Sequence, residues 1–131
     1  MSRSAIYTVN TDIAVLEGGI IPLGAIVRRY GPCLDLNGNG ITVRGDGYYT
    51  VNSSITVEPT AAGPVTVQLL LDGVAVAGAT ASETATAGAP VNLSIVGMVR
   101  DCCPDGALTL TVQLVEGAGN VVNIATNVFR L

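Results

Sequence analysis

The chain of 131 residues contains no histidine, no lysine and no tryptophan, and its six cationic residues are all arginines. Without histidine, a serine or cysteine nucleophile has no imidazole base to activate it. Without lysine, neither Schiff-base chemistry nor a P-loop that holds phosphate through lysine can be built. Zinc sites of the mixed cysteine–histidine kind are excluded as well. These absences argue against an enzyme.

Charge of either sign is scarce. Only 12% of the residues are charged and the net charge is -4, whereas an average soluble domain is about 25% charged. Nucleic-acid binding needs a basic surface, so this balance argues against a nucleic-acid partner. The longest uncharged run, 84–99, contains Pro90, Asn92 and Ser94. It is shorter than the about 20 apolar residues that a spanning helix needs, so no membrane span is expected.

The sequence cannot place two of the carboxylates as a catalytic pair. A glycosidase needs two of them at a fixed separation across a cleft. Here they are scattered, mostly in or beside turns, where they keep loops soluble, and no catalytic residue is assigned. They are Asp12, Glu17, Asp35, Asp46, Glu58, Asp72, Glu83, Asp101, Asp105 and Glu116.

Runs of valine, threonine, isoleucine and leucine dominate the chain, separated by glycine, proline, asparagine and aspartate. In the clearest run, 47–57, Tyr49, Val51, Ile55 and Val57 alternate with polar residues, which is the period of a β-strand. No helical periodicity of ten residues or more occurs. About eight to ten strands at this spacing predict an all-β sandwich or barrel. The expected strands are 6–16, 20–30, 41–43, 47–57, 65–71, 74–82, 91–99, 108–114 and 121–131.

The last expected strand, 121–131, is apolar on both faces. A strand of this kind needs cover on both faces. With so few charges on the chain, we expect the second cover to come from another subunit of an obligate homo-oligomer. The alternative is a central strand inside a monomer. The expected interface residues are Val122, Ile124, Val128, Phe129 and Leu131.

Five segments, taken in order, resemble the jelly-roll domain shared by tumour necrosis factor and the complement globular heads. GDGYYTVNSSITVEP (45–59) is similar to the family's G-x-Y-x-[VF] strand, and LLLDGVAVAGATAS (69–82) to its L-x-x-[ND]-G-x-x-V turn. PVNLSIVGMV (90–99), LTLTVQL (108–114) and NVVNIATNVFRL (120–131) are similar to its last three strands. The resemblance implies a jelly-roll sandwich of ten strands, over residues 20–131, that assembles as a compact homotrimer.

The resemblance is strongest to bacterial and phage versions, which occur on spore surfaces and as virion decoration, fibre or tail-tip proteins. No collagen-like repeat or heptad repeat is present, which favours a phage decoration or head-fibre role over a spore-surface one. Residues 1–19 are then an attachment arm for a capsid or other virion protein, or a first strand. The rival hypothesis is a receptor-binding or adhesin head that recognises a cell-surface glycan or protein, through loops such as 83–90 and 100–106.

One turn has the oxygen spacing of a calcium loop. Asp35, Asn37 and Asn39 occupy every second position of a segment that also contains Gly38 and Gly40, and Asp46 follows eleven residues after Asp35. The flanking helices and bidentate glutamate of an EF-hand are missing. Asn-Gly pairs are also explained as ordinary turn residues. Both interpretations stay open, and structural calcium is the only cofactor that the sequence suggests.

Three smaller features of the sequence are also candidates for function. Arg44-Gly45-Asp46 matches an integrin-binding tripeptide, although a glycine turn also accounts for it. The aromatic pair Tyr48 and Tyr49 offers a sugar-stacking platform, or one ring that faces the core. The cysteines Cys33, Cys102 and Cys103 are too few for a disulfide scaffold. They are free loop thiols, a bridge from Cys33 to one of the pair, or a thiol cluster between subunits.

Overall fold

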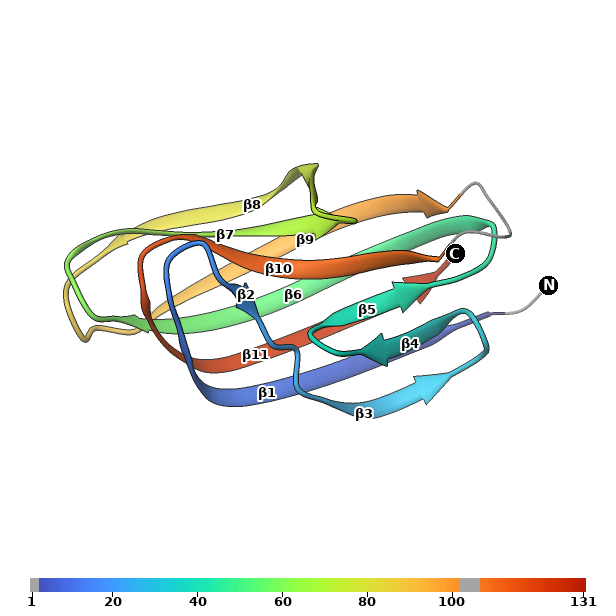
Figure 1. Cartoon of the computed structure of the whole chain (residues 1–131), viewed down its shortest axis with the longest axis horizontal. Coiled ribbons are helices and arrows are strands. Elements are labelled where there is room, and N and C mark those ends of the chain that lie inside the picture. Colours follow the sequence, from blue (N-terminus) through green and yellow to red (C-terminus); the bar gives the residue numbers. More distant parts are fainter. Residues whose placement is uncertain (1–2, 102–106) are drawn as a thin grey trace.

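The computed structural model describes residues 3–101 and 107–131, and these form a sandwich of two antiparallel sheets (Figure 1). The first sheet has the order β3 (Ala25–Tyr30), β1 (Ala5–Val15), β11 (Gly119–Arg130), β6 (Gly47–Pro59), β9 (Val91–Asp101). The second has the order β4 (Leu34–Asn37), β5 (Gly40–Val43), β10 (Leu108–Glu116), β7 (Gly63–Leu71), β8 (Val74–Ala85), and β2 (Ile20–Ile21) also pairs with β10. The expected jelly-roll sandwich is confirmed.

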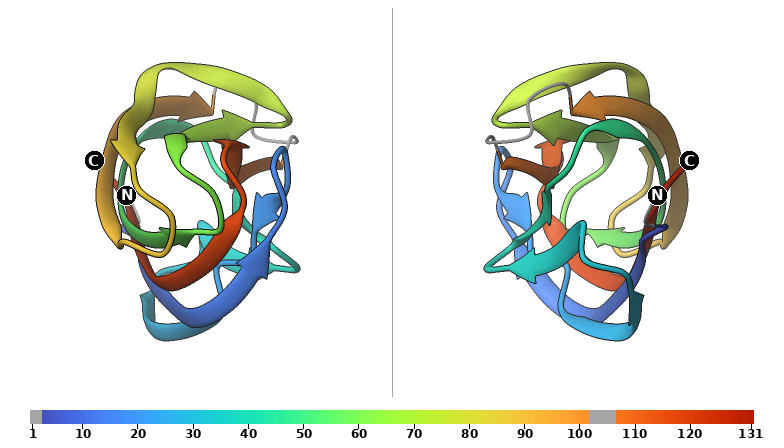
Figure 2. Two further views of the ribbon diagram at one scale, coloured as in Figure 1. Left: turned by 90° about the vertical axis from the view of Figure 1, so that its left-hand side faces the viewer. Right: turned by 90° about the vertical axis from the view of Figure 1, so that its right-hand side faces the viewer.

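The core lies between the two sheets, which curve around it when viewed from either end (Figure 2). It forms because alternate residues of each strand point inward. Tyr49, Val51, Ile55 and Val57 of β6 are all buried, as the period of two predicts. Their counterparts in the second sheet include Val67 and Leu69 of β7 and Leu110, Val112 and Leu114 of β10.

Two short elements differ from the sequence prediction. The expected strand 20–30 is broken into β2 and β3, which lie in different sheets. Pro22 stands between them, and Gly24 has a φ of +90° so close to β1 that a Cβ there would lie 2.2 Å from the Val9 carbonyl oxygen. β4, which covers part of the supposed calcium loop, was not predicted, since four residues carry too little alternation to be recognised.

A row of hydroxyl side chains crosses the inner face of the first sheet. Thr8 of β1 pairs in register with Thr126 of β11, which pairs with Ser53 of β6. All three residues are buried. The Ser53 and Thr126 hydroxyls lie 2.9 Å apart and hydrogen-bond each other, whereas the Thr8 hydroxyl has no partner among the described residues.

Residues 5–15 of the N-terminal segment form β1, which lies inside the first sheet between β3 and β11. A docking role for residues 1–19 stays a prediction. Most of the expected loop 100–106, with Cys102 and Cys103, lies outside the described residues.

The charges are separated along the long axis of the sandwich. All six arginines lie at or next to strand ends on one side, which we call the arginine end; β1 begins and β11 ends on this side of Figure 1. The four glutamates lie at the opposite end, the glutamate end, where β6, β8 and β10 finish and β1 turns into β2. The arginine end also carries aspartates, so it is mixed in charge, while the glutamate end is acidic.

Candidate interaction surface

The outer face of the first sheet is divided into an apolar half and a polar half. The register places Tyr30, Ala5, Phe129, Thr50 and Met98 in one row across the five strands, and the next row runs from Arg28 through Tyr7, Asn127 and Asn52 to Val96. Rows nearer the glutamate end consist of small and polar residues such as Ser54 and Ser94. The half at the arginine end is therefore the apolar one.

Seven of the eleven exposed large apolar side chains of the described residues lie on this half, and we call them the apolar patch. Each of the seven is between 38% and 65% exposed. Large apolar groups scattered singly over a surface need no explanation, but seven of them gathered on one half of one sheet face indicate a contact surface. The patch consists of Tyr7, Tyr30, Tyr48, Val96, Met98, Phe129 and Leu131.

Three shallow hollows shape the same face. The first, of about 320 Å³, lies between Tyr7, Tyr30, Phe129 and Arg28. A second, of about 380 Å³, adjoins it and is lined by Arg3, Tyr30, Phe129 and Leu131 among others. The third, of about 310 Å³, has a polar floor of Asn52, Asn127, Ser54 and Ser94. The face therefore has two hollows lined largely by apolar side chains and a third with a polar floor.

The structure divides the interface residues expected from the sequence. Ile124 and Val128 are fully buried in the core of their own chain, so they are not available to a partner. Phe129 and Leu131 are exposed within the apolar patch, and Val122 is half-buried beside a register irregularity in β11. Of the expected residues, Phe129 and Leu131 are the two that present a large apolar surface outward.

Sequence reasoning missed Tyr7, Tyr30, Val96 and Met98. In 91–99, Leu93, Ile95 and Val99 follow the inward phase, while Val96 and Met98 are apolar at outward positions. An apolar residue out of phase in an otherwise alternating strand is the signal that could have identified Val96 and Met98.

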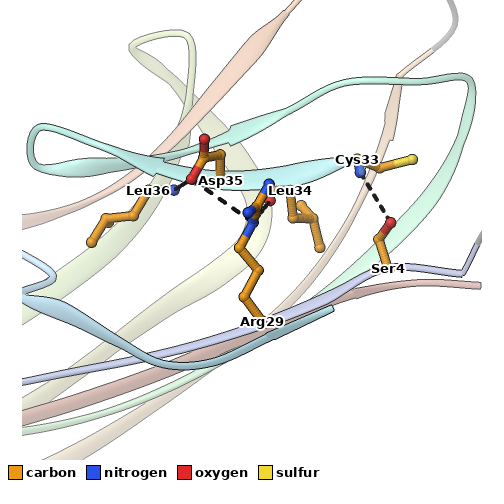
Figure 3. Close-up of polar contacts among 6 residues, drawn as sticks. All are labelled: Ser4, Arg29, Cys33, Leu34, Asp35 and Leu36. Atoms are coloured by element: carbon orange, nitrogen blue, oxygen red, sulfur yellow. Dashed lines mark hydrogen bonds and ion pairs between the residues drawn. The ribbon is translucent and has the colours of Figure 1, made fainter. Parts of the chain in front are cut away.

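The supposed calcium residues do not form an acidic cluster. Asp35 Oδ1 accepts a hydrogen bond of 2.9 Å from the Leu36 amide and lies 3.8 Å from Arg29 Nε (Figure 3). Asn37 and Asn39 flank the tight turn from β4 to β5, while Asp46 lies in the next turn, between β5 and β6. No group of three or more acidic, cysteine or histidine residues in the described parts of the chain could hold a metal ion. A calcium site stays a prediction without geometric support.

Cys33 and Tyr49 lie together at the arginine end. Cys33 is a buried free thiol whose amide donates to Ser4 Oγ at 3.0 Å (Figure 3). Tyr49 is the ring of the aromatic pair that faces the core, and burial, followed by its hydrogen bond with Cys33, raises its pKa well above the usual range. Tyr48 points outward, where the Arg100 guanidinium carbon lies 5.5 Å from its ring centroid. Cys102 and Cys103 lie outside the described residues, so any bridge or thiol cluster stays a prediction.

The comparisons with known proteins agree with this topology. Murine APRIL has a TM-score of 0.76 at 13% identity, over 98% of this chain and 99% of that one. The fold is that of the tumour necrosis factor and complement jelly rolls. The globular domain of zebrafish complement 1qA has a TM-score of 0.70 at 9% identity (97% and 95% covered), and PRD1 vertex protein P5 has 0.69 at 12% (98% and 96%).

No family model matches this jelly roll, and no curated protein sequence does. At these identities the likeness shows the fold and not a function. Among the described residues there is also no helix with the length and apolar character needed to cross a membrane.

Proposed function

We propose that this jelly roll is a non-enzymatic structural protein that assembles as a homotrimer through its apolar patch and decorates the surface of a phage virion. The observation that carries the proposal is the gathering of seven exposed large apolar side chains on one half of one sheet face. Water-exposed apolar surface of this kind is stabilised by burial in an assembly. The similarity of the fold to that of PRD1 vertex protein P5 supports the virion role.

The two borders of the patch differ, which favours a ring over a face-to-face dimer. Tyr7, Tyr30 and Phe129 form an aromatic border over β3, β1 and β11, while Val96 and Met98 form an aliphatic border on β9. Contact of one copy's aliphatic border with the next copy's aromatic border uses both borders of every copy, and it forms a closed ring where the rotation between copies closes.

The size of the surface fits this arrangement. A standard interface buries about 800 Å² on each partner. Each subunit of a ring has two such contacts, which together would cover about a quarter of the 6402 Å² that one chain exposes.

The assembly is tested by measuring molar mass with light scattering after gel filtration. A mass near 40 kDa, about three times the 13.3 kDa of one chain, is expected for the wild type. Phe129→Glu and Met98→Glu place a charge on each border and are expected to lower the mass to that of one chain. Leu16→Glu is the matched control, because Leu16 is 79% exposed but lies in the turn after β1, away from the patch.

A wild-type mass of 13.3 kDa would contradict the trimer, and so would a Phe129→Glu protein that keeps the wild-type mass. The surface role is tested separately by immunogold labelling of intact particles from the source of the protein. Label on intact virions supports the proposal, and label found only on disrupted particles contradicts it.

A further inference from the structure

The turn between β5 and β6, at the arginine end, consists of Arg44, Gly45 and Asp46. The Arg44 and Asp46 residues are both exposed. Neither side chain has a hydrogen-bond or ion-pair partner within the residues that the structure describes. A guanidinium and a carboxylate, separated by a single glycine, are therefore available to a ligand.

The backbone of this turn is held at four points. The buried Tyr49 hydroxyl lies 2.9 Å from the Arg44 carbonyl oxygen and 2.8 Å from that of Gly45, and donates to them. The Arg44 amide donates to the Cys33 carbonyl oxygen at 2.7 Å. The Arg130 guanidinium donates to the Asp46 carbonyl oxygen. A turn that is ordered before binding loses little conformational freedom when it binds.

Gly45 is required at the centre of the turn. Its φ is +102°, a conformation that residues with a Cβ rarely adopt, and a Cβ there would lie 3.1 Å from Cys33 Sγ. The glycine therefore brings the backbone down onto Cys33 and Tyr49, while its two charged neighbours are exposed.

We propose that the Arg44-Gly45-Asp46 turn binds a cell-surface receptor of the integrin type, one that presents a divalent cation next to an acidic pocket. The Asp46 carboxylate supplies the hard oxygen ligand that Mg²⁺ or Mn²⁺ accepts from a protein. The Arg44 guanidinium donates its fork of N–H groups to a carboxylate in the receptor's pocket. This site goes beyond the structural role, and neither side chain lines the hollows of the apolar face.

The test measures binding of the purified full chain to an immobilised integrin that takes Arg-Gly-Asp peptides, by surface plasmon resonance in Mn²⁺ buffer. We expect saturable binding that EDTA abolishes and a cyclic Arg-Gly-Asp peptide displaces. Asp46→Glu moves the carboxylate by one methylene and Arg44→Gln removes the charge, and each is expected to weaken binding about 10- to 100-fold. Glu58→Asp also shifts a carboxylate by one methylene, but at the glutamate end, and is expected to bind as the wild type does.

A second variant separates presentation of the turn from its chemistry. Tyr49→Phe keeps both charged side chains and removes the hydroxyl that holds two of the turn carbonyls, so we expect weaker binding with the same cation dependence. Circular dichroism and molar mass are recorded for every variant. Absence of cation-dependent binding by the wild type would overturn the proposal, as would Asp46→Glu binding at wild-type affinity. Since these variants leave the apolar patch intact, either result is independent of the trimer test.

Discussion

Replacement of Thr8 by valine is expected to stabilise the protein. Thr8 is 0% exposed, and its hydroxyl has no hydrogen-bond partner in the described part of the chain. A buried hydroxyl without a partner costs about 1–3 kcal/mol. Valine keeps the branched shape and the strand preference and removes the polar atom. The neighbouring hydroxyls of Thr126 and Ser53 bond each other, so neither is left unpaired by the change.

The expected shift can be worked out in degrees. The entropy of unfolding is about 2.1 cal/mol/K per residue, or about 0.28 kcal/mol/K for this chain, so 1–3 kcal/mol corresponds to a rise in Tm of about 4–11 °C. Differential scanning calorimetry measures the shift, with wild type and variant at one protein concentration, because association adds to the apparent stability.

Two control variants test the reasoning behind the shift. Thr126→Val leaves the buried Ser53 hydroxyl unpaired and is expected to lower Tm. The double variant Ser53→Ala/Thr126→Val removes both partners and is expected to recover part of that loss. A fall in Tm for Thr8→Val would refute the argument, because it would mean that the Thr8 hydroxyl is satisfied in solution, for instance by a buried water molecule.

Three further outcomes are expected. Burial raises the pKa of Tyr49, so the folded protein keeps this phenol neutral. The contribution of the neutral phenol to the free energy of unfolding is fully present below about pH 10, the unfolded pKa, and is lost as the pH rises above it. Alkaline unfolding curves should show the loss in the wild type and not in Tyr49→Phe. Gly97→Val should lower Tm, since a Cβ added there would lie 3.1 Å from Leu69 Cδ2 and 3.2 Å from Ala79 Cβ. A Tm equal to that of the wild type would show that the facing strands can shift to make room for the side chain. EDTA should leave Tm unchanged, because Asp35 already accepts a hydrogen bond from the Leu36 amide and pairs with Arg29. A clear drop in Tm would support the calcium-site hypothesis.

Strand prediction succeeded where an alternating run is long. The thirteen residues of β6 and the eleven of β9 alternate over enough positions for the period of two to be unmistakable. It failed at 20–30, where Pro22 and Gly24 interrupt the run and signal a break that the count of apolar residues overrides. Gly24 comes close to β1 where the chain passes from one sheet to the other, and alternation alone does not reveal that change.

The interface residues show the same limit. A register irregularity in β11 between Val121 and Asn123 changes which side chains face the core. Val121 is consequently buried and Val122 is not, although counting by twos back from Ile124 places Val122 inside. A shift of one residue exchanges the two faces of a strand. Faces assigned by alternation are therefore correct only as far along the strand as the irregularity.

The separation of arginines from glutamates makes each subunit an electric dipole directed along the sandwich. Rotation about a single axis parallel to the strands keeps every subunit pointing the same way, so the dipoles add in a cyclic ring, whereas they cancel when rings stack back to back. An assembled ring would therefore approach a charged particle or cell with a defined end first. Salt weakens such steering once the Debye length, about 8 Å at physiological ionic strength, falls below the distance of approach.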